Sequence, residues 1–141
     1  MGNFNLSQSL VMYQFLDLFF IIFHTLLIFF NLFGWIWRRT RKLNLITLLL
    51  TGSSWFILGI WHGIGFCPLT EWHWRVLEKL GQQDLPGSYI TYLIWRLTGF
   101  TADGQWVDSL TVVLYFLALA ASLLVNLLLR KKHQIKTGDF L

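Results

Sequence analysis

Three long apolar runs, at residues 15–37, 44–66 and 107–129, restrict this chain to a few possible folds. Each run is long enough to cross a hydrocarbon core of about 30 Å as an α-helix, which rises about 1.5 Å per residue. The chain is 55% hydrophobic and only 13% charged, whereas a soluble domain carries about 25% charged residues. The sequence therefore predicts an all-α membrane protein, in which residues 1–141 form a single integral membrane domain with three transmembrane helices.

Basic residues follow two of these runs directly. Arginine and lysine cluster after the first run and again after the third, at Arg38, Arg39, Arg41, Lys42, Arg130, Lys131 and Lys132. Such clusters favour the cytoplasmic side of a membrane, and residues 67–105, between the second and third runs, carry no basic excess. We therefore expect the N-terminus and residues 67–105 to lie outside and the tail at residues 130–141 to lie in the cytoplasm. This topology accounts for the net charge of +4, so no nucleic-acid partner is expected.

The outer segment contains signals for two short helices. Thr70 suits an N-cap, Glu71 suits the first turn of a helix, and Gly81 suits a position just past its end. A second helix is expected from residue 88 to residue 98, with Gly99 as its stop. Both helices are too short to cross a bilayer, so we expect them to be interfacial or re-entrant.

The most distinctive stretch of the chain is Cys-Pro-Leu-Thr-Glu-Trp-His-Trp at residues 67–74, preceded by Trp-His-Gly-Ile-Gly-Phe and followed by Leu-Pro-Gly-Ser-Tyr-Ile. With these motifs the chain resembles a family of small bacterial membrane proteins catalogued as domain of unknown function 2784. The resemblance covers about residues 15–129 and includes Asp17 and His24, two turns apart on the first helix. It implies a helical protein of the bacterial inner (cytoplasmic) membrane. It implies no activity, because the family has none to carry over.

Polar residues interrupt the first two apolar runs. Asp17, His24 and Asn31 recur every seven residues, so they lie on one face of the first helix. Polar groups in hydrocarbon need partners, so we expect this face to contact other helices, either through hydrogen bonds or as a proton-carrying or ligand-binding stripe. Counting along the helices places Asp17 level with His62, and we predict that the two side chains pair. The same count separates His24 from His62 by about 9 Å in depth, which disfavours a haem held between them.

Further reactive side chains follow the second run, namely Cys67, Glu71 and His73, close to His62. Their spacing matches no standard zinc pattern, so no metal site is predicted. Cys67 beside His62 or His73 is the only nucleophile–base pair that we identify in the sequence. No activating motif accompanies it, so an enzyme is not the favoured interpretation.

The favoured function is that of an accessory or structural subunit of a larger membrane complex, or of a homo-oligomer, in contact with the lipid bilayer. Small residues at Gly59 and Gly63, and at Ala118 and Ser122, are the predicted close-packing surfaces between helices. No cofactor is predicted. The alternatives are a redox-associated module that uses the intramembrane Asp and His residues near quinone or haem, and an envelope-facing enzyme that uses Cys67.

Overall fold

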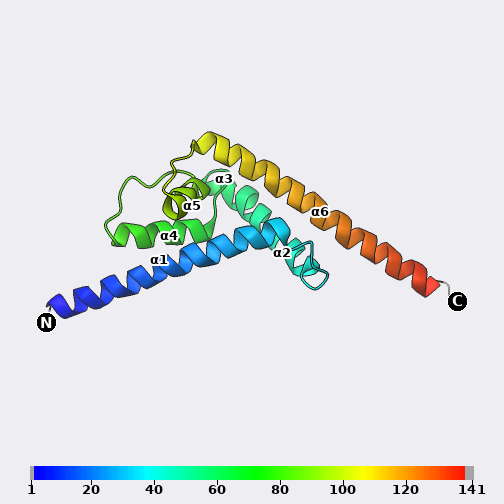
Figure 1. The fold of residues 1–141 in the computed structure, drawn as a ribbon, viewed down its shortest axis with the longest axis horizontal. Coiled ribbons are helices and arrows are strands. Elements are labelled where there is room, and N and C mark those ends of the chain that lie inside the picture. The colour runs from blue at the N-terminus through cyan, green and yellow to red at the C-terminus, as the bar shows by residue number, and fades with distance from the viewer. Residues whose placement is uncertain (1, 139–141) are drawn as a thin grey trace.

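The computed structural model describes residues 2–138 of the chain, and the side chains of residues 7–128. The described part consists of helices joined by turns and loops, without a β-strand (Figure 1). In chain order the elements are α1 (Gly2–Phe33), α2 (Arg41–Ser53), the π-helix η1 (Ser54–Leu58), α3 (Gly59–His62), α4 (Pro68–Lys79), α5 (Tyr89–Thr98) and α6 (Gly104–Gly138). The prediction of an all-α fold is confirmed.

Three stretches are long and apolar enough to cross a membrane: Ser7–Phe33, Arg41–His62 and Gly104–Leu128. They correspond to the three predicted spans, with different ends, so the chain has the helices of a multi-pass membrane protein. The first and last described residues lie at opposite ends of the molecule, because α1 and α6 run in the same direction (Figure 1).

The turn between the first two spans begins earlier than predicted, because α1 ends at Phe33. Polar side chains of the turn and of α2 donate hydrogen bonds to backbone carbonyl groups at the end of α1. The Thr40 hydroxyl donates to the Gly34 carbonyl oxygen at 2.7 Å, and the fully buried Asn44 amide donates to the Phe30 carbonyl oxygen, also at 2.7 Å. These bonds hold the start of α2 against the end of α1.

The second span is one continuous helical path made of α2, η1 and α3. It stops at His62, four residues before the predicted end, because Gly63 adopts a φ of 102° that a helix cannot contain. Gly59 and Gly63 therefore do not form the predicted helix-packing surface. A Cβ on Gly59 would lie 3.1 Å from the Ile64 Cα, so Gly59 lets the chain fold back on its own helix end.

The second and third spans pack closely around Tyr115 of α6. Its hydroxyl donates to the Leu48 carbonyl oxygen at 2.9 Å, and its ring packs with Leu48 and Ala118 in a small apolar cluster. Gly52 is buried beside the hydroxyl, where a Cβ would overlap the Tyr115 oxygen. Ala118 and Ser122 are both buried within the chain. The Asn31 amide connects the first span to the second through a 3.1 Å bond to the Thr51 hydroxyl.

The two predicted short helices are present as α4 and α5. α4 begins at Pro68, which has a φ suited to a first helical position, so Cys67 rather than the predicted Thr70 occupies the N-cap position. α5 begins after Ser88, whose side chain accepts from the Thr91 backbone N–H, and it ends at Gly99 with a φ of 74°. The prediction of a helix at residues 88–98 is confirmed to within one residue.

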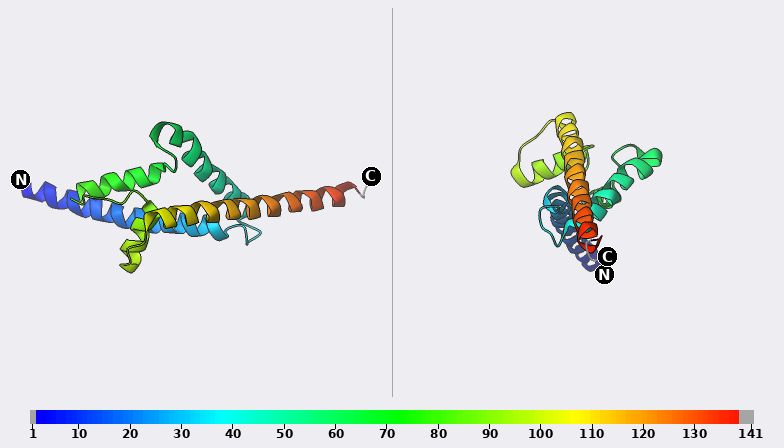
Figure 2. Two further views of the ribbon diagram at one scale, coloured as in Figure 1. Left: turned by 90° about the horizontal axis from the view of Figure 1, so that it is seen from above. Right: turned by 90° about the vertical axis from the view of Figure 1, so that its right-hand side faces the viewer.

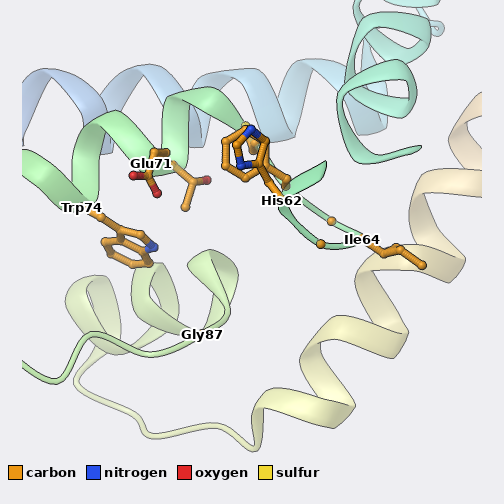
Figure 3. Close-up of a pocket in the computed structure, with 10 residues that line it drawn as sticks. His62, Ile64, Glu71, Trp74 and Gly87 are labelled. Atoms are coloured by element: carbon orange, nitrogen blue, oxygen red, sulfur yellow. The ribbon is translucent and has the colours of Figure 1, made fainter. Parts of the chain in front are cut away.

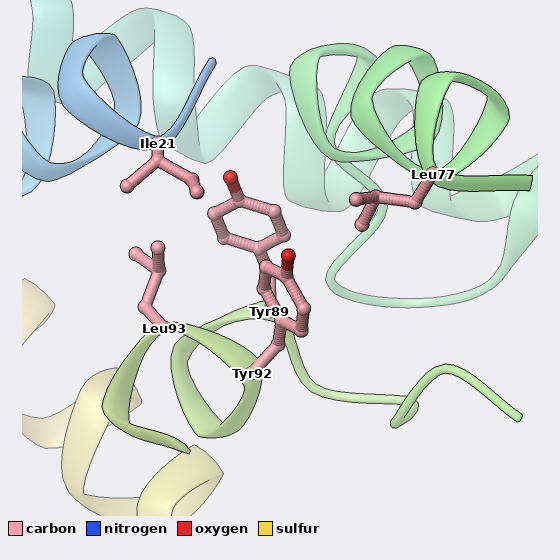
Figure 4. Packing of buried hydrophobic residues seen from close by; sticks show 5 residues of the cluster. All are labelled: Ile21, Leu77, Tyr89, Tyr92 and Leu93. Carbon is pink, nitrogen blue, oxygen red and sulfur yellow. The ribbon is translucent and has the colours of Figure 1, made fainter. Parts of the chain in front are cut away.

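Helix α4 lies beside the N-terminal half of α1, and α5 crosses near both helices (Figures 1 and 2). An apolar cluster joins the three helices. Its buried members come from all of them and are Ile21, Leu77, Tyr89, Tyr92 and Leu93. Figure 4 shows the two tyrosine rings rising from α5 into the space between Ile21 of α1 and Leu77 of α4. We refer to α4, α5 and their connection, residues 68–98, as the cap.

Candidate functional site

Four polar side chains meet where α1 contacts the cap, and we refer to Asp17, His73, Tyr89 and Arg96 as the buried polar cluster. The His73 Nε2 lies 2.8 Å from the Asp17 Oδ1, and the His73 Nδ1 lies 2.6 Å from the Tyr89 hydroxyl. The other Asp17 oxygen, Oδ2, accepts from the Arg96 guanidinium at 3.4 Å. One carboxylate of the first span therefore holds groups from both helices of the cap.

Hydrogen-bond chemistry determines the tautomer of His73. A carboxylate only accepts hydrogen bonds, so Nε2 carries the hydrogen that points at Asp17. In a neutral imidazole Nδ1 is then an acceptor, and the Tyr89 hydroxyl donates to it. The hydrogen bonds run in one direction, from Tyr89 through His73 to Asp17.

The surroundings favour the neutral form of His73. Its side chain has no exposed surface, and its ring stacks on Phe20 with centroids 5.4 Å apart. Burial lowers the pKa of His73 below 6.5, and the hydrogen bond to Asp17 opposes this effect only in part. Burial also raises the pKa of Tyr89, which keeps its hydroxyl protonated.

His24 extends the buried polar cluster two helical turns farther along α1 than Asp17. Its ring stacks on Tyr89 with centroids 4.1 Å apart, and the side chain is buried. Within the part of the chain that the structure describes, its Nδ1 has no hydrogen-bond partner. Asn31 bonds to Thr51 of the second span. The three residues of the predicted stripe, which recur every seven positions, therefore all face other helices rather than the outside of the molecule.

The predicted pair of Asp17 and His62 is wrong, because Asp17 bonds to His73 and Arg96 instead. His62 is exposed at the end of α3, where its ring stacks on Phe66 with centroids 4.5 Å apart. The pair was predicted by counting residues along the helices, and this count compared only residues within the apolar runs. It did not anticipate that a helix of the cap would lie beside α1 and present a histidine at the level of Asp17.

The reactive side chains that follow the second run, Cys67, Glu71 and His73, lie in two separate places in the structure. Cys67 and Glu71 line a cavity of about 220 Å³ together with His62 and Trp74, as Figure 3 shows for the labelled residues. His73 is not among the lining residues, because positions two apart on a helix point in different directions. Among the described residues, no three His, Cys, Asp or Glu side chains are arranged to hold a metal ion. Glu71 also accepts a hydrogen bond from Arg75, one turn farther along α4, at 3.1 Å.

Sequence reasoning missed Tyr89 and Arg96. The two residues are seven positions apart on α5, so they lie on the same side of that helix. This is the spacing that drew attention to Asp17 and His24 on the first span. The same seven-residue spacing on α5 predicts a second polar face, directed at α1.

The lowered pKa of His73 predicts that the folded protein loses stability in acid. As the pH falls below 6.5, the unfolded chain binds a proton at this histidine that the folded protein resists binding. The unfolding midpoint should therefore be highest above pH 6.5 and fall as the pH drops below it, while His73→Gln should show a weaker dependence. Detergent-solubilised protein unfolded with sodium dodecyl sulfate and followed by circular dichroism would measure this. The exposed His62→Gln control should keep the wild-type dependence, and an equally flat profile for both variants would contradict the prediction.

Comparison with known proteins supports the resemblance found in the sequence. No curated protein and no solved structure was found to match the chain. A family described as Protein of Unknown function (DUF2784) matches residues 14–127, which include all three candidate spans in large part, the buried polar cluster and the cavity. Because the match covers most of the chain, the protein belongs to this family of proteins of unknown function.

Proposed function

We propose that this protein is an accessory subunit of a larger assembly in the inner membrane of a bacterium, in which its spans contact other membrane proteins or further copies of itself. One observation carries the proposal: the buried side chains of Asp17, His73 and Tyr89 bond to one another instead of facing a cavity. Asp17, His73 and Tyr89 form a chain of hydrogen bonds, and none of them lines the cavity beside Cys67. An enzyme presents its reactive groups to a substrate, whereas these three side chains attach the cap to α1.

The surface that remains for other molecules is large and apolar. Within the chain, only 17%, 22% and 17% of the most apolar stretch of each candidate span is buried. The first span exposes a set of aromatic side chains, at Phe15, Phe19, Phe23, Phe29 and Phe33. Packing of such surfaces against another membrane protein is driven by close contact and interhelical hydrogen bonds. The cap, attached to α1 through Asp17 and Ile21, adds a further surface with α4 and α5 as its interfacial helices.

The assembly proposal predicts the mass of the purified particle. After extraction in a mild detergent, native mass spectrometry should detect species heavier than the single 16.6 kDa chain, with a fixed ratio of subunits. Asp17→Ala should lower the yield of that species, because it releases the cap from α1. A single chain that turns over an envelope substrate, with turnover lost in Cys67→Ser, would overturn the proposal in favour of an enzyme.

We also propose that the N-terminus and the cap lie outside and that the turn at residues 34–40 lies in the cytoplasm, on the basis of the basic clusters. Cys67 is the only cysteine, so Cys67→Ser provides a background for introduced thiols. In that background, a membrane-impermeant maleimide should label Gln83→Cys in intact cells and Arg39→Cys only after the cells are opened. Both positions are exposed, so a difference reports the side of the membrane. Labelling of Arg39→Cys in intact cells would contradict this orientation.

A second candidate function is a quinone-associated module, and the directional chain from Tyr89 through His73 to Asp17 favours it. A neutral imidazole with one donor and one acceptor can pass a proton between its two neighbours. Organic extraction of the purified protein should then recover quinone in a fixed ratio, and His73→Gln should reduce that ratio. Absence of quinone from protein purified out of quinone-containing membranes would exclude this candidate.

A further inference from the structure

The cavity beside α4 is separate from the buried polar cluster. It lies between the end of the second span and the first two turns of α4, and Gly87 of the connection that leads to α5 forms its opposite side (Figure 3). Its volume is about 220 Å³, less than the roughly 300 Å³ at which pockets for drug-sized ligands begin. The space suits a small chemical group rather than a large substrate.

The cavity wall combines one carboxylate with aromatic rings. Glu71 and Trp74 come from successive turns of α4, and Phe66 comes from the loop before it. Among the described residues that line the cavity, none is lysine or arginine. A carboxylate next to aromatic faces attracts an ammonium group, through charge and through the negative face of the rings. An anionic or purely apolar ligand gains nothing from Glu71.

Neighbouring contacts hold both groups in place before a ligand arrives. The Trp74 ring packs on Tyr89 and Tyr92, with centroids 5.2 and 5.1 Å away. Glu71 accepts from Arg75 through Oε1 at 3.1 Å, and the Arg75 side chain is 68% exposed and does not line the cavity. Fixed side chains lose little entropy on binding, which favours recognition of a small group.

The position of the cavity indicates where the ammonium comes from. His62, on its wall, is the last residue of the second candidate span, so the cavity lies at the level where apolar helix surface ends. The most exposed apolar side chains of the same chain segment are Ile60, Trp61 and Ile64, at 76%, 71% and 88%. Figure 3 shows Ile64 pointing away from the cavity. A molecule with an ammonium in the cavity would have apolar protein surface beside it for its hydrocarbon part.

We propose that this cavity binds the primary ammonium headgroup of a membrane phospholipid, of the phosphatidylethanolamine type. Glu71 pairs with the ammonium, and Trp74 and Phe66 cover it. The acyl chains lie along the exposed apolar surface at the end of the second span. The protein thereby selects an amine lipid at the edge of its cap, whichever partners its spans contact.

Cys67 lines the cavity, so its reaction rate reports whether the cavity is occupied. The full-length protein is reconstituted in vesicles of phosphatidylethanolamine with phosphatidylglycerol, and in vesicles of phosphatidylglycerol alone. A small neutral maleimide should label Cys67 severalfold more slowly in the first vesicles. Glu71→Gln should bring the ratio of the two rates close to one, whereas Glu78→Gln should keep the wild-type ratio. Glu78 is exposed on the same helix and lies outside this cavity, so it controls for the loss of one charge.

Three results would overturn the proposal. Equal labelling rates in the two kinds of vesicle would show that the amine lipid does not occupy the cavity. Protection that persists in Glu71→Gln would show that it does not depend on the carboxylate. Free ethanolamine added to phosphatidylglycerol vesicles separates the two sources of an ammonium group. If it protects Cys67 as well as the lipid does, the ligand is a soluble amine and the lipid proposal fails.

Discussion

Replacing Asp17 with alanine is expected to release the cap from α1 and to lower the free energy of unfolding by about 1–4 kcal/mol. Asp17 is the acceptor for the Nε2–H of His73, whose side chain has no exposed surface. Leaving a buried donor without a partner costs about 1–3 kcal/mol. The bond to Arg96, whose side chain is 43% exposed, adds at most about 1 kcal/mol. Unfolding by sodium dodecyl sulfate, followed by tryptophan fluorescence, would measure the loss.

Two controls make this prediction specific. Asp17→Asn keeps an oxygen that accepts from His73, so it should lose less stability than Asp17→Ala. Glu78→Gln removes a carboxylate from an exposed position of α4 and should change the midpoint very little. Limited proteolysis gives a second measurement, because a released cap should be cut between α4 and α5 faster than in the wild-type protein. A midpoint for Asp17→Ala equal to that of the wild type would contradict the role of Asp17 in attaching the cap.

Replacing Gly52 with alanine is expected to separate the second and third spans, at a cost of about 2–4 kcal/mol. The added Cβ would overlap the Tyr115 hydroxyl oxygen, which cannot withdraw without losing its bond to the Leu48 carbonyl. Overfilling a packed interior costs about 1–3 kcal/mol, and the lost hydrogen bond adds about 1 kcal/mol. The unfolding midpoint in detergent and the near-ultraviolet signal of the tyrosine would both report the change.

A variant of Tyr115, the residue that the added Cβ would contact, tests why Gly52→Ala lowers the stability. Tyr115→Phe removes the hydroxyl and makes room for the Cβ, so Gly52→Ala should cost much less in a Tyr115→Phe background. Gly87→Ala is the matched control, because no described atom lies within 4 Å of the Cβ that it adds and its φ is not positive. If the effects of Gly52→Ala and Tyr115→Phe simply add, the contact between the two residues does not cause the loss.

The residues at which the helices end show which features of the structure local sequence signals can predict. Gly99 follows α5, as predicted, because a glycine with positive φ ends a helix without strain. Gly63 looked like part of a packing surface in the sequence, yet it ends the second span for the same reason. A glycine in an apolar run can either pack against another helix or end its own helix, and only the conformation of the surrounding backbone decides between the two.

The chain by itself determined the three spans and the two short helices, because apolar length, basic clusters and turn residues act over a few neighbouring positions. It also showed that Asp17, His24 and Asn31 share a helix face. Only the tertiary structure decided that Asp17 meets His73, a residue 56 positions away, rather than His62. The physical reason is the placement of α4 beside α1 and its rotation about its own axis. That rotation turns His73 toward the first span and Glu71 toward the cavity, and packing of the tyrosines of α5 between the helices maintains it.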